Sequence, residues 1–547
     1  MITEITLENF QSIKDRFTVP IKPLTILVGP NSAGKSSIFD ALEIFELLLL
    51  TKKENDIKLN SLIRNSARLE TNINGLPDKF YDRRQFSLGV KIQIDNSSAE
   101  EDWESAKNTP INCFLLPVGS NTFEIIIDID SGYRNRLKSF IIKFNNQILI
   151  KLESEIFKEE GQHPRIRSKK LTIFRLNFFD INTSDFEDDE FTSEFDEVLI
   201  DDKKIILNLY EEQEFGDNVT PRNYLTFDSR WFTLRTSLNV VHLFQSLLAF
   251  TEQNIEGSLL SFLPKVDASR TIPSASENLY FITSDYILNN YVGIYKDRPY
   301  YEIDSLFFEV EKKFNKNIND HWHWLAQVFG GKKLFEMTEH YEDGDEKKYS
   351  GALIDLADKI NKYISNELFN NIGYIIDTDV LMLIPNELDY SWLTHNVPAI
   401  VKLYLLDANR VRHEFNDVGS GIGYIIPAIC SIVSPRICKI QQPELHLHPA
   451  LQAPIADICL ENCNNNRNII LETHSEHLIL RLLRLIRNNK NVSNNIKPEN
   501  VSVLYFEPQI NNISTRIKSL RISEDGSFID EWPNGFFIDR YKDIFDE

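Results

Sequence analysis

The chain has 547 residues and a hydrophobic fraction of 42%, so we expect a folded protein of at least two structural units, because single cores stop growing at roughly 250 to 300 residues. Its formal net charge of −22 argues against a protein whose whole surface coats DNA or RNA, although a local basic groove is compatible with it. The five cysteines include no CxxC pair, the N-terminus shows no signal peptide and no apolar run is long enough to span a bilayer. Together these features predict a cytoplasmic protein without a membrane anchor.

Two strands and a helix are predicted near the N-terminus. The start of the chain alternates apolar and polar residues around Ile5, Leu7 and Phe10, which predicts an edge strand. A second strand is expected from Leu24 to Val28, and helical spacing runs from Ile38 to Leu50.

The segment between that strand and that helix matches the phosphate-loop pattern GxxxxGK[ST] in the structural context that the motif requires. Glycines at both ends of the loop permit backbone angles that turn successive N–H groups inward, towards an anion at the start of the helix. We expect Lys35 to contact the β- and γ-phosphates of a nucleotide, and the hydroxyl of Ser36 to bind Mg²⁺. The predicted nucleotide-binding residues are Gly29, Pro30, Asn31, Ser32, Ala33, Gly34, Lys35, Ser36 and Ser37.

A β-rich region follows from about residue 85, where FSLGVKIQI, TFEIIIDID and RLKSFIIKFNNQILIKLESEIF are separated by turn residues and predict an antiparallel meander. Acidic residues dominate the stretch from Asp185 to Asp202, which predicts a solvated loop or flap, or else a docking strip for a basic partner. From Leu238 to about Asn371 the pattern becomes mainly helical.

Strand signals return from about residue 399 in IVKLYLLD, RICKIQ and RNIILETHS, with helical stretches between them, so the last part of the chain is expected to be α/β. A turn of small residues, Gly419-Ser420-Gly421, precedes an apolar helix. Hydrolysis of a nucleotide also needs an acid at a strand end and a sensor of the γ-phosphate. ICKIQQPELHLHPALQ is the candidate for the acid, and Thr473-His474-Ser475 at the end of the next strand is the candidate for the sensor.

This order of motifs resembles the ATPase heads of the SMC, RecF and ABC superfamily. It is most similar to bacterial ATPases that also end in WPNGFF after VLYFEP, among them the PtuA-like ATPase subunits of Septu and retron anti-phage defence systems. The resemblance implies an α/β fold, an ABC/SMC-type P-loop ATPase head split by a large β-rich and helical insertion. The head would comprise residues 1–95 and 396–547, and the insertion residues 96–395.

The resemblance also implies roles for single residues. Gly419, Ser420 and Gly421 would form the signature that contacts the γ-phosphate of a nucleotide held by a second subunit, and His474 would be the switch histidine. A homodimer would then enclose two Mg-ATP molecules, since each site needs both subunits. The expected function is an ATPase of an anti-phage defence complex that controls a partner nuclease of HNH type, with a retron reverse transcriptase and its RNA/DNA as a further partner.

The chain departs from its relatives at Gln441 and Gln442, where they carry an acid at the first position and often an acid or Gln at the second. An amide neither provides the charge that Mg²⁺ prefers nor accepts a proton from water. Three explanations are open: slow hydrolysis, replacement of the acid by Glu444, or an engineered change of Glu to Gln at position 441. The expected catalytic residues are Lys35, Gln441, Gln442, Glu444 and His474, and the expected metal contacts are Ser36 and Gln441.

Several alternatives accompany this interpretation. The protein would instead be an ATP-loaded scaffold that holds a toxic effector silent without useful turnover, or a DNA-repair ATPase of RecF/OLD-like type. A metal-dependent nuclease site could be built from the acidic and histidine residues of PELHLHP and ETHSEH. The helix face that carries Arg481, Arg484 and Arg487 is either solvated or contacts nucleic acid or a partner. The C-terminal stretch with Trp532, Pro533, Phe536 and Phe537 either packs on the ATPase core or forms an exposed docking tail.

Overall fold

The structure is a computed structural model, and it describes residues 1–49, 85–96, 119–130, 136–157, 165–174, 197–200, 204–210, 272–273, 278–283, 321–338, 355–368, 373–382, 398–434, 437–463, 467–488, 497–508 and 514–532. The chain divides into two compact units, and each is described by itself. The first consists of Met1–Lys22, Gly29–Leu260 and Leu504–Ser519, and the second of Pro23–Val28, Ser261–Val503 and Leu520–Glu547. The domain boundaries expected after residues 95 and 395 stay a prediction.

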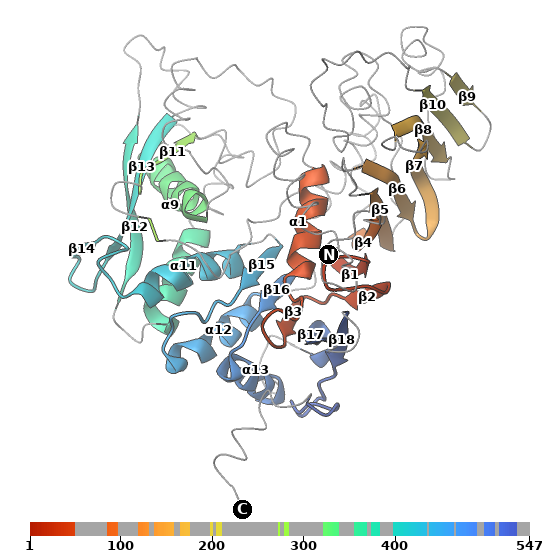
Figure 1. The fold of residues 1–547 in the computed structure, drawn as a ribbon. Helices are drawn as coiled ribbons and strands as arrows, with labels where there is room; N and C mark the ends of the chain where they lie inside the picture. The colour runs from red at the N-terminus through yellow and green to blue at the C-terminus, as the bar shows by residue number, and fades with distance from the viewer. Residues whose placement is uncertain are drawn as a thin grey trace, which may run out of the picture. The chain divides into compact units, whose positions relative to one another are not determined.

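The first unit contains a nine-stranded sheet in the order β2-β1-β4-β5-β6-β7-β8-β10-β9, and every pairing in it is antiparallel (Figure 1). The strands are β1 (Ile2–Glu8), β2 (Phe17–Pro20), β4 (Gln85–Asn96), β5 (Gly119–Asp130), β6 (Arg136–Phe144), β7 (Gln147–Phe157), β8 (Arg165–Phe174), β9 (Glu197–Ile200) and β10 (Lys204–Tyr210). The predicted meander is therefore confirmed.

The expectation that the first strand lies at an edge is wrong. β1 pairs with β2 on one side and with β4 on the other, so both of its edges are hydrogen-bonded. Alternation of apolar and polar residues reports one buried face of a strand, and it carries no information about whether both edges have partners.

Helix α1 (Ser37–Leu49) starts directly after the glycine-rich loop, as predicted. Its side chains are buried at Ile38, Phe39, Ala41, Leu42, Ile44 and Phe45. The Ser37 hydroxyl donates to Oε1 of Gln11 over 2.6 Å, and Nε2 of Gln11 donates to Asp40 over 2.7 Å. Gln11 has a φ of 48° and so occupies the left-handed region in the turn after β1, from which it fixes the first turn of α1.

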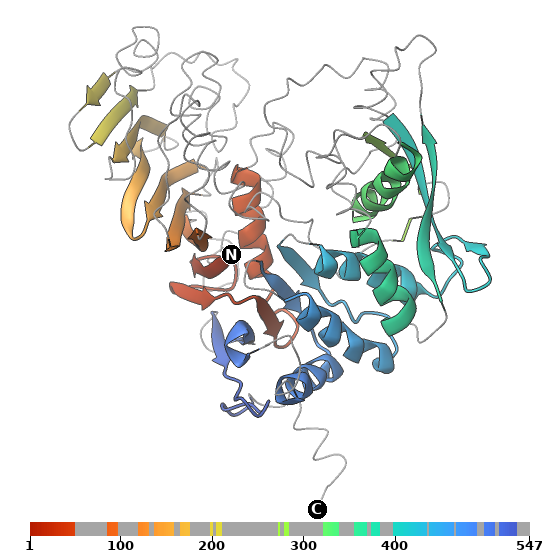
Figure 2. The ribbon, with the colours of Figure 1, turned by 180° about the vertical axis from the view of Figure 1, so that it is seen from behind.

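The second unit contains an antiparallel sheet in the order β11-β13-β12, with β14 paired to β13 (Figures 1 and 2). Its strands are β11 (Tyr280–Thr283), β12 (Ile375–Met382), β13 (Pro398–Leu406) and β14 (Arg412–His413). Helix α9 (His321–Thr338) packs closely on it, because a Cβ added at Gly330 would lie 2.5 Å from the side chain of Val401.

Two of these strands lie where the sequence predicts helix or no strand. β11 falls within the mainly helical region predicted from Leu238 to Asn371, and β12 precedes the predicted return of strands at residue 399. Helix is confirmed at α9 and in residues 355–368, which end in the π-helical turn Tyr363–Leu368. β11 is only four residues long and pairs with β13, more than a hundred positions away, so its pairing partner rather than its local pattern stabilises it.

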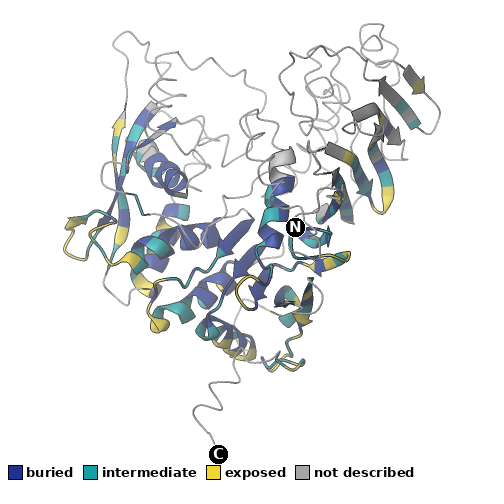
Figure 3. Cartoon of the chain, viewed as in Figure 1, coloured by how far each residue is buried: buried dark blue, intermediate teal, exposed yellow. Residues whose placement is uncertain are grey.

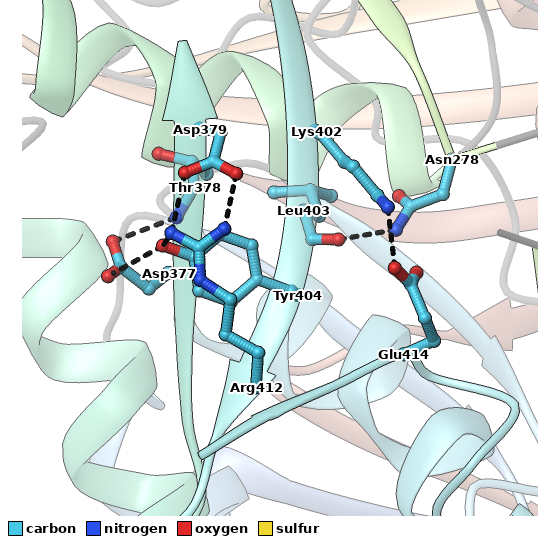
Figure 4. A network of polar contacts seen from close by, with 9 residues as sticks. All are labelled: Asn278, Asp377, Thr378, Asp379, Lys402, Leu403, Tyr404, Arg412 and Glu414. Atoms are coloured by element: carbon cyan, nitrogen blue, oxygen red, sulfur yellow. Dashed lines mark hydrogen bonds and ion pairs between the residues drawn. The ribbon is translucent and has the colours of Figure 1, made fainter. Parts of the chain in front are cut away.

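A polar network covers the face of β12 and β13 that carries Asp377, Asp379 and Tyr404 (Figure 4). The guanidinium of Arg412 donates to both carboxylate oxygens of Asp379, over 2.6 and 2.8 Å, and lies 4.1 Å from the centre of the Tyr404 ring. The Tyr404 hydroxyl donates to Asp377 over 3.1 Å. These contacts hold β14 against the hairpin of β12 and β13.

A five-stranded sheet has the order β15-β16-β3-β17-β18, and its pairs β15–β16 and β16–β3 are parallel. The strands are β15 (Cys438–Gln441), β16 (Ile469–Glu472), β3 (Leu24–Val28), β17 (Val501–Pro508) and β18 (Thr515–Leu520). All residues of β3 and β16 are buried (Figure 3), which is typical of parallel strands covered on both faces. The expected α/β architecture of the last part of the chain is confirmed by α11 (Ser420–Val433), α12 (Pro449–Glu461), α13 (Glu476–Asn488) and the short turn Pro498–Asn500.

The arginine-bearing helix α13 buries Leu478, Ile479, Leu482, Leu483 and Ile486, so its apolar face belongs to the core. Arg481 donates to both carboxylate oxygens of Asp457 on α12, the shortest distance being 2.7 Å. Arg487 donates to the backbone oxygen of Asp525 over 2.8 Å, whereas Arg484 is exposed. At least two of the three arginines therefore have partners within the chain.

Three further sequence features are described only in part. The acidic stretch appears only at Glu197–Ile200, as β9, and its other residues lie outside the described ones. Near the C-terminus the ring of Trp532 packs 4.7 Å from that of Phe528, while Pro533, Phe536 and Phe537 lie outside the described residues. Cys430, Cys438, Cys459 and Cys463 are free thiols, and burial raises the pKa of Cys438 to about 11. Among the helices that can be described, none combines the length and apolar character needed to cross a bilayer.

Candidate functional site

Three parallel strands of the second unit end side by side. Gln441, the last residue of β15, is in register with Glu472, the last residue of β16, and Glu472 is in register with Leu27 of β3. The backbone N–H of Thr473 extends this pairing by donating to the oxygen of Leu27 over 3.1 Å. Ligand sites of α/β folds form at the carboxyl ends of parallel strands, so this edge of the sheet is the candidate site.

The loop after β3 is the predicted phosphate loop, and its backbone contains three positive φ angles, 139° at Gly29, 60° at Ser32 and 89° at Gly34. A Cβ added at Gly29 would lie 2.5 Å from the backbone oxygen of Phe506, and one added at Gly34 would lie 2.0 Å from the hydroxyl of Ser12. The close approach requires glycine at both positions. Contacts within the first unit thus hold the backbone of this loop at Gly29 and Gly34.

Lys35 is only 3% exposed, and its ammonium group donates to the backbone oxygens of Gly29 and Pro30 over 3.1 and 2.9 Å. The side chain therefore folds back over its own loop. Ser36 is half-buried at the start of the helix, whereas Ser37 is fully buried and uses its hydroxyl on Gln11. Of the two serines, Ser36 is thus the one whose surroundings fit a ligand role.

The loop after β15 begins with two glutamines in different environments. Nε2 of Gln441 donates to Oε2 of Glu472 over 3.0 Å. Gln442 has a φ of 45° and its backbone N–H donates to the oxygen of Glu472 over 2.8 Å, which turns the chain away from the sheet. Glu472 is 6% exposed, and its sequence context indicates it only as a member of the alternative nuclease site, not as a residue of the ATP site. Its position is visible only once the register of β15 and β16 is known.

The loops after β15 and β16 are hydrogen-bonded to each other. The backbone N–H of His474 donates to Oε1 of Glu444 over 2.8 Å. The hydroxyl of Ser475 donates to Oε1 of Gln452 on α12 over 2.6 Å, and it also accepts the N–H of Leu478, which caps the start of α13. The predicted switch histidine is therefore held at its backbone by Glu444 and by the capped helix that follows.

The predicted signature Gly419-Ser420-Gly421 forms the start of helix α11. Gly419 is the N-cap and provides no side-chain hydrogen bond to the first turn, and both Gly419 and Ser420 are exposed. A Cβ added at Gly421 would lie 2.9 Å from the backbone oxygen of His446, which itself has a φ of 64°. The structure thus brings the signature close to the PELHLHP loop of the same chain.

The histidines of that loop have structural partners. The ring of His446 lies 4.7 Å from that of Tyr424, and Nδ1 of His448 accepts the N–H of Ala450 over 3.3 Å, which caps α12. Across the residues available for description, no three or more His, Cys, Asp and Glu side chains are grouped so as to hold a metal ion. The acidic and histidine residues considered for a nuclease site do not form a ligand cluster here.

Two family profiles match the sequence. The AAA ATPase domain profile matches residues 1–479, and a profile described as a protein of unknown function (DUF3696) matches residues 496–546. No curated protein matches the chain. The first match confirms the expected fold class, an α/β P-loop ATPase head.

Solved structures of SMC head domains are among the similar folds. An SmcHead bound to the C-winged helix domain of ScpA is 9% identical with a TM-score of 0.38, covering 96% of this chain and 98% of that chain. An Smc head domain with an extended coiled coil, bound to the C-terminal domain of ScpA derived from Pyrococcus furiosus, is 10% identical with a TM-score of 0.37, covering 95% and 96%. The SMC head domain from Thermotoga maritima is 8% identical with a TM-score of 0.32, covering 95% and 99%.

Proposed function

The chain belongs to the AAA ATPase domain family, and we propose that it is an ATPase that holds Mg-ATP where strands β3, β15 and β16 end. One observation carries the proposal: Gln441, Glu472 and Leu27 are in register across three neighbouring parallel strands. Gly29 follows Leu27 by two positions, so the phosphate loop begins where β3 ends. Residues more than 400 positions apart in the sequence would then serve the same triphosphate.

The loop provides most of the grip on the nucleotide. Its inward-turned N–H groups suit phosphate oxygens, and the ammonium group of Lys35 would exchange the backbone oxygens of Gly29 and Pro30 for the β- and γ-phosphates. Because Lys35 is almost fully buried, its charge lies in a region of low dielectric, where its attraction for a phosphate is strong.

The chain offers oxygen donors that are suited to Mg²⁺. Mg²⁺ usually keeps several waters and binds one or two carboxylates and hydroxyls together with phosphates, so it does not need a cluster of three acidic side chains. The hydroxyl of Ser36 and the buried carboxylate of Glu472 fit this requirement, whereas Gln441, also expected as a metal contact, uses its amide to donate to Glu472. Bound Mg²⁺ would neutralise charge that develops on the phosphates during hydrolysis.

A second copy of the chain is part of the proposal. The exposed and uncapped start of α11 at Gly419 and Ser420 offers backbone N–H groups to an anion, and it suits the γ-phosphate of a nucleotide held by the partner copy. Closure of two heads around two Mg-ATP molecules would be the step that holds or releases the partner effector.

The biological setting rests on the resemblance of the sequence motifs. We propose an anti-phage defence complex in the cytoplasm, with an HNH-type nuclease as the effector and a retron reverse transcriptase as a further partner. The rival function is an ATP-loaded clamp that keeps the effector silent. The lack of an acid at positions 441 and 442, which are both Gln, favours this function. A RecF/OLD-like repair ATPase is the third candidate.

The nucleotide site is tested by equilibrium binding of ATP with Mg²⁺ to the wild-type protein and to Lys35→Ala. We expect Lys35→Ala to abolish binding, whereas Lys497→Ala, at an exposed lysine paired with Glu499, serves as the control with wild-type affinity. Equal affinity of Lys35→Ala and the wild type would refute the site.

Dimerisation and partners need separate experiments. Light scattering should show a mass increase of the wild type with ATP and none for Ser420→Arg, which blocks the signature. Turnover measurements then separate the ATPase from the clamp. Purification from cells that carry the neighbouring genes should recover a nuclease, and recovery of neither nuclease nor nucleic acid would contradict the defence complex.

A further inference from the structure

We propose that Glu472 is the acid of the ATP site and takes the role that Gln441 lacks, namely to hold the water shell of Mg²⁺. The inference rests on the proposed function and assigns within it a residue that the ATPase motifs of the sequence leave out. Gln441 becomes a positioning residue for this carboxylate.

The contact between the two side chains is direct. Nε2 of Gln441 donates to Oε2 of Glu472 over 3.0 Å. A glutamate at position 441 would be acceptor-only when ionised and would face a second carboxylate at hydrogen-bond distance. The amide of Gln441 is therefore a suitable hydrogen-bond donor to the carboxylate of Glu472, whereas ionised acids at both positions would repel each other.

The position of β16 in the sheet explains why its terminal acid is well placed. β16 lies between β15, which carries Gln441, and β3, which leads into the phosphate loop. In parallel strands, residues in register project to the same face, so Glu472 lies on the face of Gln441 and one strand closer to β3. Its backbone is also fixed, because its oxygen accepts the N–H of Gln442 over 2.8 Å.

Burial gives a second reason for a functional role. Glu472 is 6% exposed, and acidic side chains are rarely buried to this degree because the charged form loses its hydration. A buried carboxylate at the end of a parallel strand suits a cation that brings its own positive charge. Mg²⁺ is a hard cation that prefers such an oxygen ligand over an amide.

Glu444, the other candidate for the missing acid, has a different task. Its carboxylate accepts the backbone N–H of His474 over 2.8 Å and so holds the loop after β16. Substitution there would move His474, whereas substitution of Glu472 would change the charge beside the phosphate loop strand. The two acids are therefore separable by experiment.

The test measures the affinity of a fluorescent ATP analogue with Mg²⁺ and with EDTA, and the binding of Mn²⁺ to the protein–ATP complex by electron paramagnetic resonance. We expect Glu472→Gln to keep the metal-free affinity within about twofold and to weaken Mn²⁺ binding about tenfold or more. Glu461→Gln is the matched control, because this carboxylate ends α12 and accepts the hydroxyl of Tyr363 over 2.8 Å. It should behave as the wild type does.

A swap of the two residues keeps the test valid if the single variant folds poorly. The double variant Gln441→Glu with Glu472→Gln preserves one amide and one acid, and it should restore Mn²⁺ binding to within about threefold of the wild type. Wild-type protein that binds no nucleotide would overturn the proposed function itself. Wild-type protein that binds Mg-ATP, with Glu472→Gln equal to it in Mn²⁺ affinity, would overturn only the assignment of Glu472.

Discussion

The carboxylate of Glu444 accepts a hydrogen bond from the backbone N–H of His474 over 2.8 Å, and it thereby ties the loop after β15 to the loop after β16. The two residues are thirty positions apart in the sequence. The contact gives Glu444 a structural task that does not require it to replace the acid missing at Gln441.

This contact predicts different outcomes for two substitutions of Glu444. Glu444→Gln retains an oxygen acceptor and should keep the stability within about 0.5 kcal/mol, whereas Glu444→Ala should cost about 1 to 2 kcal/mol because the N–H of His474 loses its acceptor. Urea unfolding of both variants measures the difference. If Glu444→Gln instead abolished ATP turnover while leaving stability unchanged, Glu444 would be the acid after all.

The packing of the phosphate loop predicts that Gly34 tolerates no side chain. Gly34→Ala adds a Cβ that would lie 2.0 Å from the Ser12 hydroxyl, at a φ of 89°, so we expect a loss of about 1 to 3 kcal/mol and weaker ATP binding. Adding Ser12→Gly removes the clash and leaves the backbone strain. Thermal unfolding of the double variant should recover part of the loss; no recovery at all would show that the clash contributes nothing.

The contacts of the α13 arginines predict that substitution of Arg481 lowers stability and that substitution of Arg484 does not. Arg481→Ala removes the two-oxygen contact with Asp457 and should lower stability by about 1 kcal/mol, whereas Arg484→Ala at an exposed position should leave it unchanged. Denaturation midpoints of both variants check this. If α13 contacts nucleic acid, Arg484→Ala should weaken that binding more than Arg481→Ala does, and the reverse order would contradict the structural role of Arg481.

Tyr404 predicts a loss of stability at alkaline pH. Burial, followed by the neighbouring Asp377, raises the pKa of Tyr404 to about 12, while an unfolded tyrosine titrates near 10. Between about pH 10 and 12 the unfolded chain releases this proton and the folded protein keeps it, so the stability contributed by neutral Tyr404 falls as the pH rises.

The effect should be smaller than the roughly 1.4 kcal/mol per pKa unit of an unscreened group, because solvent screens part of it. Tyr404→Phe is the reference because it carries no ionisable group. Between pH 9.5 and pH 11.5, the unfolding free energy of the wild type should fall relative to that of Tyr404→Phe. Parallel pH profiles of the two proteins would contradict the prediction. Absorbance at 295 nm gives the titration of the tyrosines directly.

Part of this protein is determined by short stretches of sequence. The phosphate loop, the strand Leu24–Val28 before it and the helix after it were predictable because glycine freedom, an apolar run and helical spacing act within a few residues. The meander from residue 85 was predictable for the same reason, since turn residues separate strands that pair with their neighbours along the chain.

The tertiary structure alone decided which distant strands are neighbours. Pairing of β1 with β4, pairing of β11 with β13 and pairing of β16 with β3 all join segments far apart in the chain. A strand's own residues specify which of its faces is buried but not its partner, which is selected by the packing of the whole sheet. For that reason the sequence alone shows that the chain departs from its relatives at Gln441, whereas only the register of β15 with β16 shows that the buried Glu472 lies beside this residue.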